Sequence, residues 1–286
     1  MMTQNNSHII DIFKQIKNQE LSIAVAVEGG GLRGIVSASL LKVLNDFGLA
    51  ANVKAISGTS SGAINAAYFL NNDLTSCFEL YRNMASKNFI QPLRWPNAMN
   101  LDYLFEDKIK KHFPIAVSTN NKCPFFVSVT DVSTGRGEYL TARSQKELHH
   151  LLRASTSAPV FTTNKEYIGN KHYNDGHIEL AVPFDAFDVY KFDYILCLLT
   201  QPKNYLKKKS QFSKFIEKIA LINHNKKFKI SYSKSANQYN DRLKQIYESK
   251  KIIPIAVNTN TFVVSKMTTN PSDVDKCIES VLENFL

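Results

Sequence analysis

The chain lacks the features that mark several large classes of protein. Its 286 residues include only four cysteines, and none stands in the CxxC or Cys/His spacing of a metal site. We therefore expect reduced thiols at Cys77, Cys123, Cys197 and Cys277. No eighteen apolar residues run together, so no transmembrane helix is predicted. Repeats and low-complexity linkers are also missing, and 44% hydrophobic content is typical of a globular chain with a full core.

A secretory signal is another missing feature. The first twenty residues are polar and have neither the basic start nor the apolar core that such a signal needs. We therefore expect a cytoplasmic protein, with peripheral membrane attachment as a further expectation from its charge.

Positive charge is concentrated in one part of the chain. The formal net charge is +10, and residues 201–251 hold 14 Lys or Arg against 3 Asp or Glu, so the remainder is close to neutral. Such a segment, with its run Lys207-Lys208-Lys209, is predicted to meet an anionic membrane, at about 1 kcal/mol per surface cation. The alternative is a solvated lysine-rich face, and nucleic acid is the less expected partner.

Short apolar runs alternate with amphipathic stretches from residue 21 onward. This alternation predicts an α/β fold, a three-layer sandwich with a mainly parallel central sheet flanked by helices. A helix is expected over 36–47, with Gly48 as its C-cap, and residues 73–121 are expected to be helical and irregular. The expected strands span 21–27, 53–57, 125–130, 171–173 and 194–200.

After residue 200, the pattern predicts further helices and strands. Helices are expected over 212–222 and 235–249, and strands over 252–257 and 261–265. A last helix over 273–285 is expected to begin with a capping box made by Ser272 and Asp275.

The first predicted strand leads into VEGGGLRG, which contains GxGxxG at Gly29, Gly31 and Gly34. A dinucleotide-binding fold uses this pattern to bring its backbone close to a pyrophosphate. That interpretation needs an acidic residue about 20 positions later, at the end of the second strand. Lys54 and Ala55 stand there instead, which disfavours a nucleotide site.

The second predicted strand leads directly into GTSSG, a GxSxG motif centred on Ser60. Between a strand and a helix this motif is typical of a nucleophile elbow, which lifts a serine clear of the sheet. The following helix directs its positive end at the hydroxyl. A plain helix start is the alternative, but the strand before the motif favours a nucleophile.

A serine nucleophile needs donors for an oxyanion and a base for its proton. The backbone N–H groups of Gly29, Gly30 and Gly31 are candidate donors. Asp175, in the turn YNDGH, is a candidate base because burial near the nucleophile raises a carboxylate pKa. An ordinary Asp-Gly turn is the alternative, and His177 and His224 remain candidate bases.

Together GGGLRG, GTSSG and NDG resemble the motifs of the patatin-like phospholipases, as does the Ala-Ser-rich segment 154–159. The resemblance covers residues 24–199. It implies a patatin-like fold, a dyad of the nucleophile Ser60 and the base Asp175, and an oxyanion hole at Gly29, Gly30 and Gly31. The other motif positions are Leu32, Arg33, Gly34, Gly58, Thr59, Ser61, Gly62, Gly176 and His177.

His177 is a departure, since the family has a small residue after Asp-Gly. A bulky imidazole is expected either to crowd the turn or, if charged, to lower the pKa of Asp175. We expect three regions: a polar N-terminal segment at 1–20, a patatin-like catalytic domain at 21–200, and a basic C-terminal extension at 201–286 packed on the same fold. In that extension LLTQPKNY, which begins at Leu198, with YNDRL and IIPI is similar to a bacterial branch of the family that has a C-terminal extension.

The resemblance implies an acyl hydrolase, a phospholipase A or lipid esterase, acting on phospholipid or related esters without metal or organic cofactor. The alternatives are a catalytically silent lipid-binding or regulatory module and an α/β-hydrolase with a Ser-His-Asp triad. Large apolar residues before residue 113 are candidates for an acyl pocket or lid, or for ordinary core: Phe89, Leu93, Trp95 and Phe105.

Overall fold

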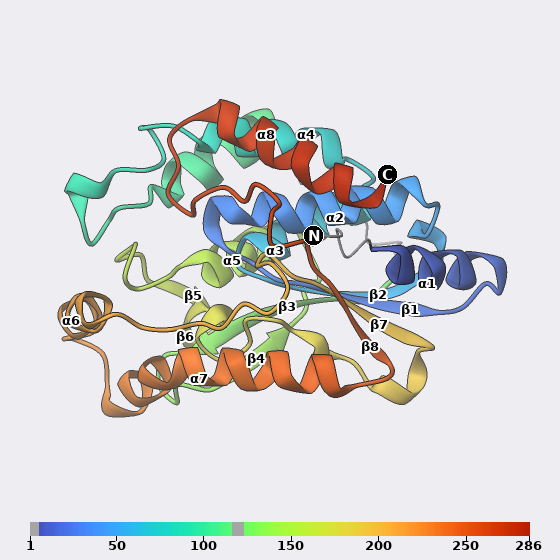
Figure 1. The fold of residues 1–286 in the computed structure, drawn as a ribbon. Helices are drawn as coiled ribbons and strands as arrows, with labels where there is room; N and C mark the ends of the chain where they lie inside the picture. The colour runs from blue at the N-terminus through green and yellow to red at the C-terminus, as the bar shows by residue number, and fades with distance from the viewer. Residues whose placement is uncertain (1–5, 116–122) are drawn as a thin grey trace.

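The computed structural model describes residues 6–115 and 123–286. In these ranges the chain forms an eight-stranded sheet in the order β5-β6-β3-β2-β1-β7-β8, with β4 paired to β3. The mostly parallel sheet lies between helices, which confirms the predicted α/β class (Figure 1). The strands are β1 (Ile23–Val27), β2 (Val53–Thr59), β3 (Phe125–Asp131), β4 (Gly137–Leu140), β5 (Glu166–Ile168), β6 (Lys171–Asp175), β7 (Tyr194–Leu198) and β8 (Ile252–Ile255).

Strand β1 lies near the middle of the sheet because its sequence, IAVAV, is apolar on both faces. All five residues are buried, as expected for a strand covered on both sides. It pairs in parallel with β2 on one side and β7 on the other. Val27 is opposite Gly58, so the carboxyl ends of β1 and β2 meet at one edge.

The sheet becomes antiparallel on the far side of β3. There β6 pairs with β3, and Asp175 lies opposite Val129. Strands β4 and β5 were not predicted, because GEYL and EYI are too short and too polar to show an apolar pattern.

Helices cover both faces of the sheet, with α2, α3, α4 and α8 on one side and α7 on the other (Figure 1). The two faces differ along β1, since Val25 and Val27 join the larger core while Ala24 and Ala26 pack with residues of α7. The helices are α1 (Ser7–Asn18), α2 (Ile35–Asp46), α3 (Ser61–Leu70), α4 (Leu74–Met84), α5 (Gln145–Thr156), α6 (Gln211–Ala220), α7 (Lys226–Glu248) and α8 (Pro271–Leu282), with a π-helix at Tyr103–His112.

The N-terminal region contains more structure than the expected polar segment. Residues 7–18 form α1, and its apolar side chains at positions 9, 12, 13 and 16 are buried. This 3,4 spacing gives a helix one apolar face despite a polar average composition. Residues 1–5 lie outside the described part of the chain.

The C-terminal third takes part in the same sheet and core. Strand β8 extends the sheet beside β7, and α8 packs against α2 and α4. Two local predictions were wrong. Residues 261–265 are irregular, and the N-cap of α8 is Asn270, whose Oδ1 accepts a hydrogen bond from the Ser272 N–H at 3.2 Å. Pro271 starts the helix because it needs no N–H partner there.

Residues 73–115 are helical and irregular as expected, and 116–121 fall outside the described ranges. Among the described helices, none combines the length and the apolar character that a bilayer crossing requires.

Replacing Phe13 by Ala tests how firmly α1 belongs to the core. Phe13 is fully buried, and its ring centroid lies 5.2 Å from that of Phe47 and 6.4 Å from that of Phe285. Phe13→Ala is expected to lower the free energy of unfolding by about 3–5 kcal/mol, measured by urea denaturation. Leu93→Ala, at a fully exposed site, is the control. Equal stability of the two variants would contradict the packing assigned to α1.

Candidate active site

Ser60 occupies a sharp turn between β2 and α3. Its φ of 56° and ψ of −131° lie where side chains are rarely found, as in a strained nucleophile elbow. Its N–H donates to Ser155 Oγ at 2.8 Å, and that hydroxyl donates to the Ser128 carbonyl at 2.8 Å. This chain of hydrogen bonds connects the turn to β3 and α5. Only 9% of Ser60 is exposed.

The glycine after the serine pair allows α3 to approach the sheet. A Cβ on Gly62 would lie 2.4 Å from the Val27 carbonyl oxygen, closer than any side chain tolerates. Its absence lets α3 begin directly behind Ser60, so the positive end of the helix faces the hydroxyl.

The glycine loop after β1 lies beside this turn. The Gly30 N–H donates to Ser61 Oγ at 2.9 Å, whereas no acceptor among the described residues binds the Gly31 N–H. Gly31 has a φ of 60° and lines the same cavity as Ser60 and Gly30. Gly29 lies behind it, where an added Cβ would meet the Thr59 carbonyl oxygen at 2.2 Å.

Polar side chains from α3 and α4 hold this loop. Asn65 Nδ2 donates to the Gly34 carbonyl at 2.8 Å, and Asn65 Oδ1 accepts from the Tyr81 hydroxyl at 2.9 Å. These residues were not identified from the sequence, since a lone Asn or Tyr within a helix carries no motif.

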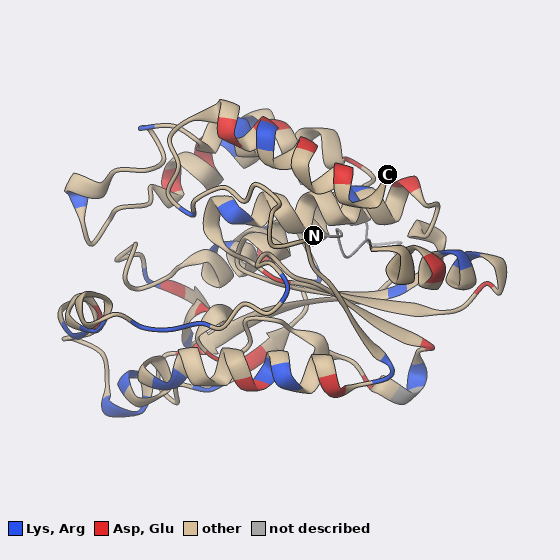
Figure 2. Ribbon diagram, viewed as in Figure 1, with Lys and Arg blue, Asp and Glu red and all other residues tan. Residues whose placement is uncertain are grey.

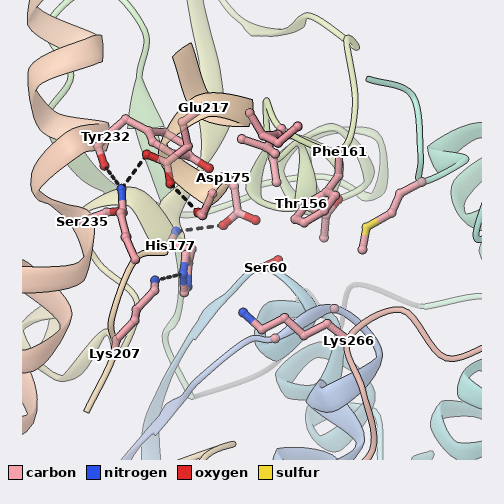
Figure 3. A pocket seen from close by; sticks show the side chains of 18 of the residues that line it. Ser60, Thr156, Phe161, Asp175, His177, Lys207, Glu217, Tyr232, Ser235 and Lys266 are labelled. Atoms are coloured by element: carbon pink, nitrogen blue, oxygen red, sulfur yellow. Dashed lines mark hydrogen bonds and ion pairs between the residues drawn. The ribbon is translucent and has the colours of Figure 1, made fainter. Parts of the chain in front are cut away.

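Asp175 ends β6 and is 95% buried. Its Oδ1 accepts the His177 N–H at 2.8 Å, and its carboxylate faces Ser60 in the same cavity (Figure 3). Burial raises the pKa of Asp175 to about 6, although the His177 N–H, the Ser60 side chain and the nearby Lys266 and Lys207 act to lower it. A buried carboxylate of this pKa is a stronger base than a solvated one.

The Ala-Ser-rich segment connects the two candidate catalytic residues. Ser155 holds the Ser60 N–H, as described above, and two residues later the Ser157 carbonyl accepts the Asp175 N–H at 3.1 Å. The same carbonyl accepts Asn174 Nδ2 at 2.9 Å. The segment therefore fixes the serine turn and the aspartate turn relative to each other.

His177 does not crowd the aspartate turn. Its imidazole is directed to Lys207, whose Nζ lies 2.5 Å from Nε2. Burial, with Lys207, Lys266 and Lys209, holds the pKa of His177 well below its usual value, so the ring is neutral at pH 7. The suggestion that a charged imidazole lowers the pKa of Asp175 was wrong, because lysines supply the positive charge.

Ser60 and Asp175 open onto one cavity of about 390 Å³ (Figure 3). Its apolar lining comes from Met99, Val160 and Phe161, and from Phe212 and Ile216 of α6. The four aromatic and aliphatic candidates for an acyl pocket do not line it. Phe89 and Phe105 are core, Leu93 is fully exposed, and the Trp95 indole donates to the Val160 carbonyl at 2.9 Å. His224 is also outside this cavity and stacks on Phe228 instead.

Comparison with known proteins identifies the family. Residues 25–188 match the sequence model of the patatin-like phospholipases, which is more than half of the chain. The chain belongs to the patatin-like phospholipase family. Its match confirms the resemblance drawn from the three motifs.

Other comparisons add little to this patatin-like assignment. The crystal structure of VipD from Legionella pneumophila is similar at a TM-score of 0.41 and 13% identity, over 93% of this chain and 67% of that one. Curated protein sequences include no match.

Part of the cavity lies beyond the patatin-like match. Lys207, helix α6, Tyr232 and Lys266 all line it, and all follow residue 188. The run at 207–209 was visible in the sequence as charge, but nothing around Lys266 indicated a place beside Ser60.

Asp175→Asn is expected to stabilise this patatin-like chain at alkaline pH. The folded-state pKa of about 6 exceeds the ordinary value of 3.8, so ionising Asp175 costs the folded state stability. This cost is absent below pH 3.8 and complete above pH 6, where two pKa units correspond to about 3 kcal/mol. The asparagine Oδ1 still accepts the His177 N–H.

Urea denaturation at pH 8 and at pH 4 measures this difference. The variant should exceed the wild type at pH 8 by about 1–3 kcal/mol and match it at pH 4. A variant that is less stable than the wild type at pH 8 would show that Asp175 is not a destabilised buried carboxylate.

Proposed function

We propose that this patatin-like chain is a serine acyl hydrolase that cleaves phospholipids or related lipid esters with a Ser60-Asp175 dyad. One observation carries the proposal: the strained serine and the buried aspartate face each other in one partly apolar cavity (Figure 3). Neither strain at a serine nor burial of a carboxylate contributes stability, so both favour a chemical role.

The reaction begins when Asp175 takes the proton of the Ser60 hydroxyl. Ser60 Oγ attacks the carbonyl carbon of the ester, and a tetrahedral oxyanion forms. As it collapses, the bond to the alcohol breaks, and the leaving alkoxide receives the proton from Asp175. Water then loses a proton to Asp175 and attacks the acyl carbonyl carbon. The bond from that carbon to Ser60 Oγ breaks, Oγ takes the proton from Asp175, and the fatty acid leaves.

The oxyanion needs donors that are aligned before the reaction. The Gly31 N–H, beside Ser60 in the cavity wall, is the leading candidate, and the start of α3 adds its positive end. The Gly30 N–H is engaged by Ser61 Oγ, so it would have to exchange that partner to contribute. Gly29 acts as a spacer that lets the loop lie against Thr59.

A triad with histidine as base has less support. The Nε2 of His177 is occupied by Lys207, and its low pKa makes its imidazole a weak base. His224 does not line the cavity of Ser60. The aspartate is therefore the better base.

Removing either dyad residue should abolish hydrolysis. Ser60→Ala and Asp175→Asn are each expected to lower kcat/KM for a short-chain phospholipid by at least about 10³-fold, since each removes a group that acts in every turnover. A fluorophosphonate probe should label the wild type at Ser60 and fail to label Ser60→Ala, as mapped by mass spectrometry.

Three further variants complete this test. Ser233→Ala, at an exposed position on α7, is the matched serine control and should keep wild-type activity. His177→Gln and His224→Gln should stay within about tenfold of it. A 10³-fold loss in one histidine variant alone would establish a triad, and a wild type that binds lipid without turnover would establish a silent module.

Helix α6, which forms part of the cavity wall, is a candidate membrane-binding element. None of its residues is buried, and its apolar face is exposed, including Phe212 at 73% and Phe215 at 59%. Lys214 and Lys218 are exposed on the same helix, and Figure 2 shows basic residues around it. We propose that α6 docks on an anionic membrane, where apolar side chains enter the interface and lysines meet head groups.

Vesicle binding by the Ser60→Ala variant tests this docking without turnover. It should bind vesicles containing phosphatidylglycerol, weaken as salt rises, and bind pure phosphatidylcholine vesicles poorly. Phe212→Ser/Phe215→Ser should reduce binding at least about tenfold, whereas Tyr247→Ser, at the far end of α7, should not. Equal binding to neutral and anionic vesicles at all salt concentrations would contradict the proposal.

A further inference from the structure

Two lysines in the wall of the catalytic cavity have no acidic partner. Lys207 and Lys266 both line the cavity that contains Ser60 and Asp175, and both are half-buried. Within residues 6–115 and 123–286, no carboxylate forms an ion pair with either ammonium, whereas their neighbour Lys209 bonds Glu217 at 2.9 Å. Unpaired cations away from bulk water cost stability, so two of them in one cavity wall point to a ligand that would pair with them.

The backbone fixes both lysines close to the reacting groups. The Lys266 carbonyl accepts the Leu32 N–H at 3.3 Å, which attaches this residue to the glycine loop. Figure 3 shows its side chain extending toward Ser60 from the opposite side of the cavity to Lys207. The ammonium of Lys207 lies over the Tyr239 ring at 5.3 Å and contacts His177.

Both ammonium groups retain hydrogen-bond donors. Lysine has three N–H donors, and Lys207 directs one at the neutral imidazole of His177, which leaves two. Burial lowers the pKa of Lys207 to about 7, and Lys266 is shifted in the same direction. An anion between them would act to raise both pKa values.

The charges around the cavity favour an anionic ligand. Lys207, Lys208, Lys209 and Lys266 line it, against two carboxylates, Asp175 and Glu217. The Glu217 carboxylate is paired with Lys209, and Asp175 accepts the His177 N–H. Glu28 lies behind the cavity, where its Oε2 accepts the Thr200 N–H at 2.6 Å. A net positive charge therefore remains for a ligand.

We infer that Lys207 and Lys266 form a subsite for the phosphodiester of a glycerophospholipid substrate. In such a lipid the phosphate and both acyl esters share one three-carbon glycerol. A phosphate held by the two lysines therefore keeps an ester in the same small cavity as Ser60, and the apolar side of the cavity accepts the acyl chain. This inference rests on the proposed function and selects phosphate-bearing lipids over neutral glycerides.

Binding to the Ser60→Ala variant tests the subsite without turnover. The probes are a short-chain diether glycerophosphocholine below its critical micelle concentration and the dialkylglycerol with the same chains, titrated by calorimetry. The phosphate-bearing probe should bind at least about tenfold more tightly. Adding Lys207→Met or Lys266→Met should each reduce this preference about threefold, and the double variant should bind both probes alike.

Matched controls separate the subsite from net charge and from folding. Lys234→Met/Lys250→Met removes two exposed lysines of the same basic segment and should keep the full preference. Lys266→Arg, which preserves the charge, should retain most of it. Circular dichroism and thermal unfolding confirm that each variant compared is folded.

Three outcomes would overturn the inference. The first is equal binding of the two probes by Ser60→Ala. The second is equal weakening of both probes in the lysine variants, which would leave the lysines only the role of lowering the Asp175 pKa. The third is lysine-dependent binding of inorganic phosphate as tight as that of the phosphate-bearing probe, which would assign the site to free phosphate.

The test of the lysine subsite and the test of hydrolysis at Ser60 can fail independently of each other. Fluorophosphonate labelling and ester turnover by the wild type report on Ser60, whatever the two lysines bind. Conversely, a lysine-dependent preference for the phosphate-bearing probe would stand in a chain without turnover.

Discussion

The candidate site depends on the parallel pairing of β1 with β2. Because Val27 lies opposite Gly58, two chain segments leave the sheet at the same edge and must turn side by side. One turn becomes the glycine loop, and the other becomes the strained turn at Ser60. For both turns to fit side by side, α3 must begin close to the end of β1. Gly62 permits this approach because it has no side chain. The remaining site residues are arranged around these two turns.

A strongly basic carboxylate and charged lysines place opposite demands on this cavity. Burial strengthens Asp175 as a base, since it raises the pKa of the carboxyl. The same burial destabilises any charged lysine beside it. Lys207 and Lys266 nevertheless lie close enough to lower that pKa. The value of about 6 is thus a balance between desolvation, which raises the pKa, and the His177 N–H, Ser60 and the two lysines, which lower it. His177 stays neutral because burial, and then the nearby lysines, disfavour its protonation.

Local patterns were sufficient to predict the α/β class, the serine turn and the aspartate turn. A buried strand followed by GTSSG needs only neighbouring residues to be recognised, and NDG likewise follows its own strand. Short, polar strands such as β4 were not predicted because three or four residues show no periodicity. Helix α1 was not predicted because the average composition of its segment is polar, although its apolar residues have helical spacing.

Local patterns could not predict the site residues that only the folded chain brings together. Lys266 lies in an irregular stretch between β8 and α8, and only the folded chain brings it against the glycine loop. Phe161 and Ile216 line the same cavity although they are more than fifty residues apart in the sequence. Their apolar side chains resemble those of any core position in the sequence.

The division of the cavity wall between two stretches of chain has an evolutionary consequence. The proposed catalytic residues lie within residues 25–188, and much of the surrounding wall is built by residues that follow. Substitutions in the last third can therefore reshape what enters without altering the bonds made or broken. A change in the ligand that enters the cavity therefore does not require a change in the three motifs.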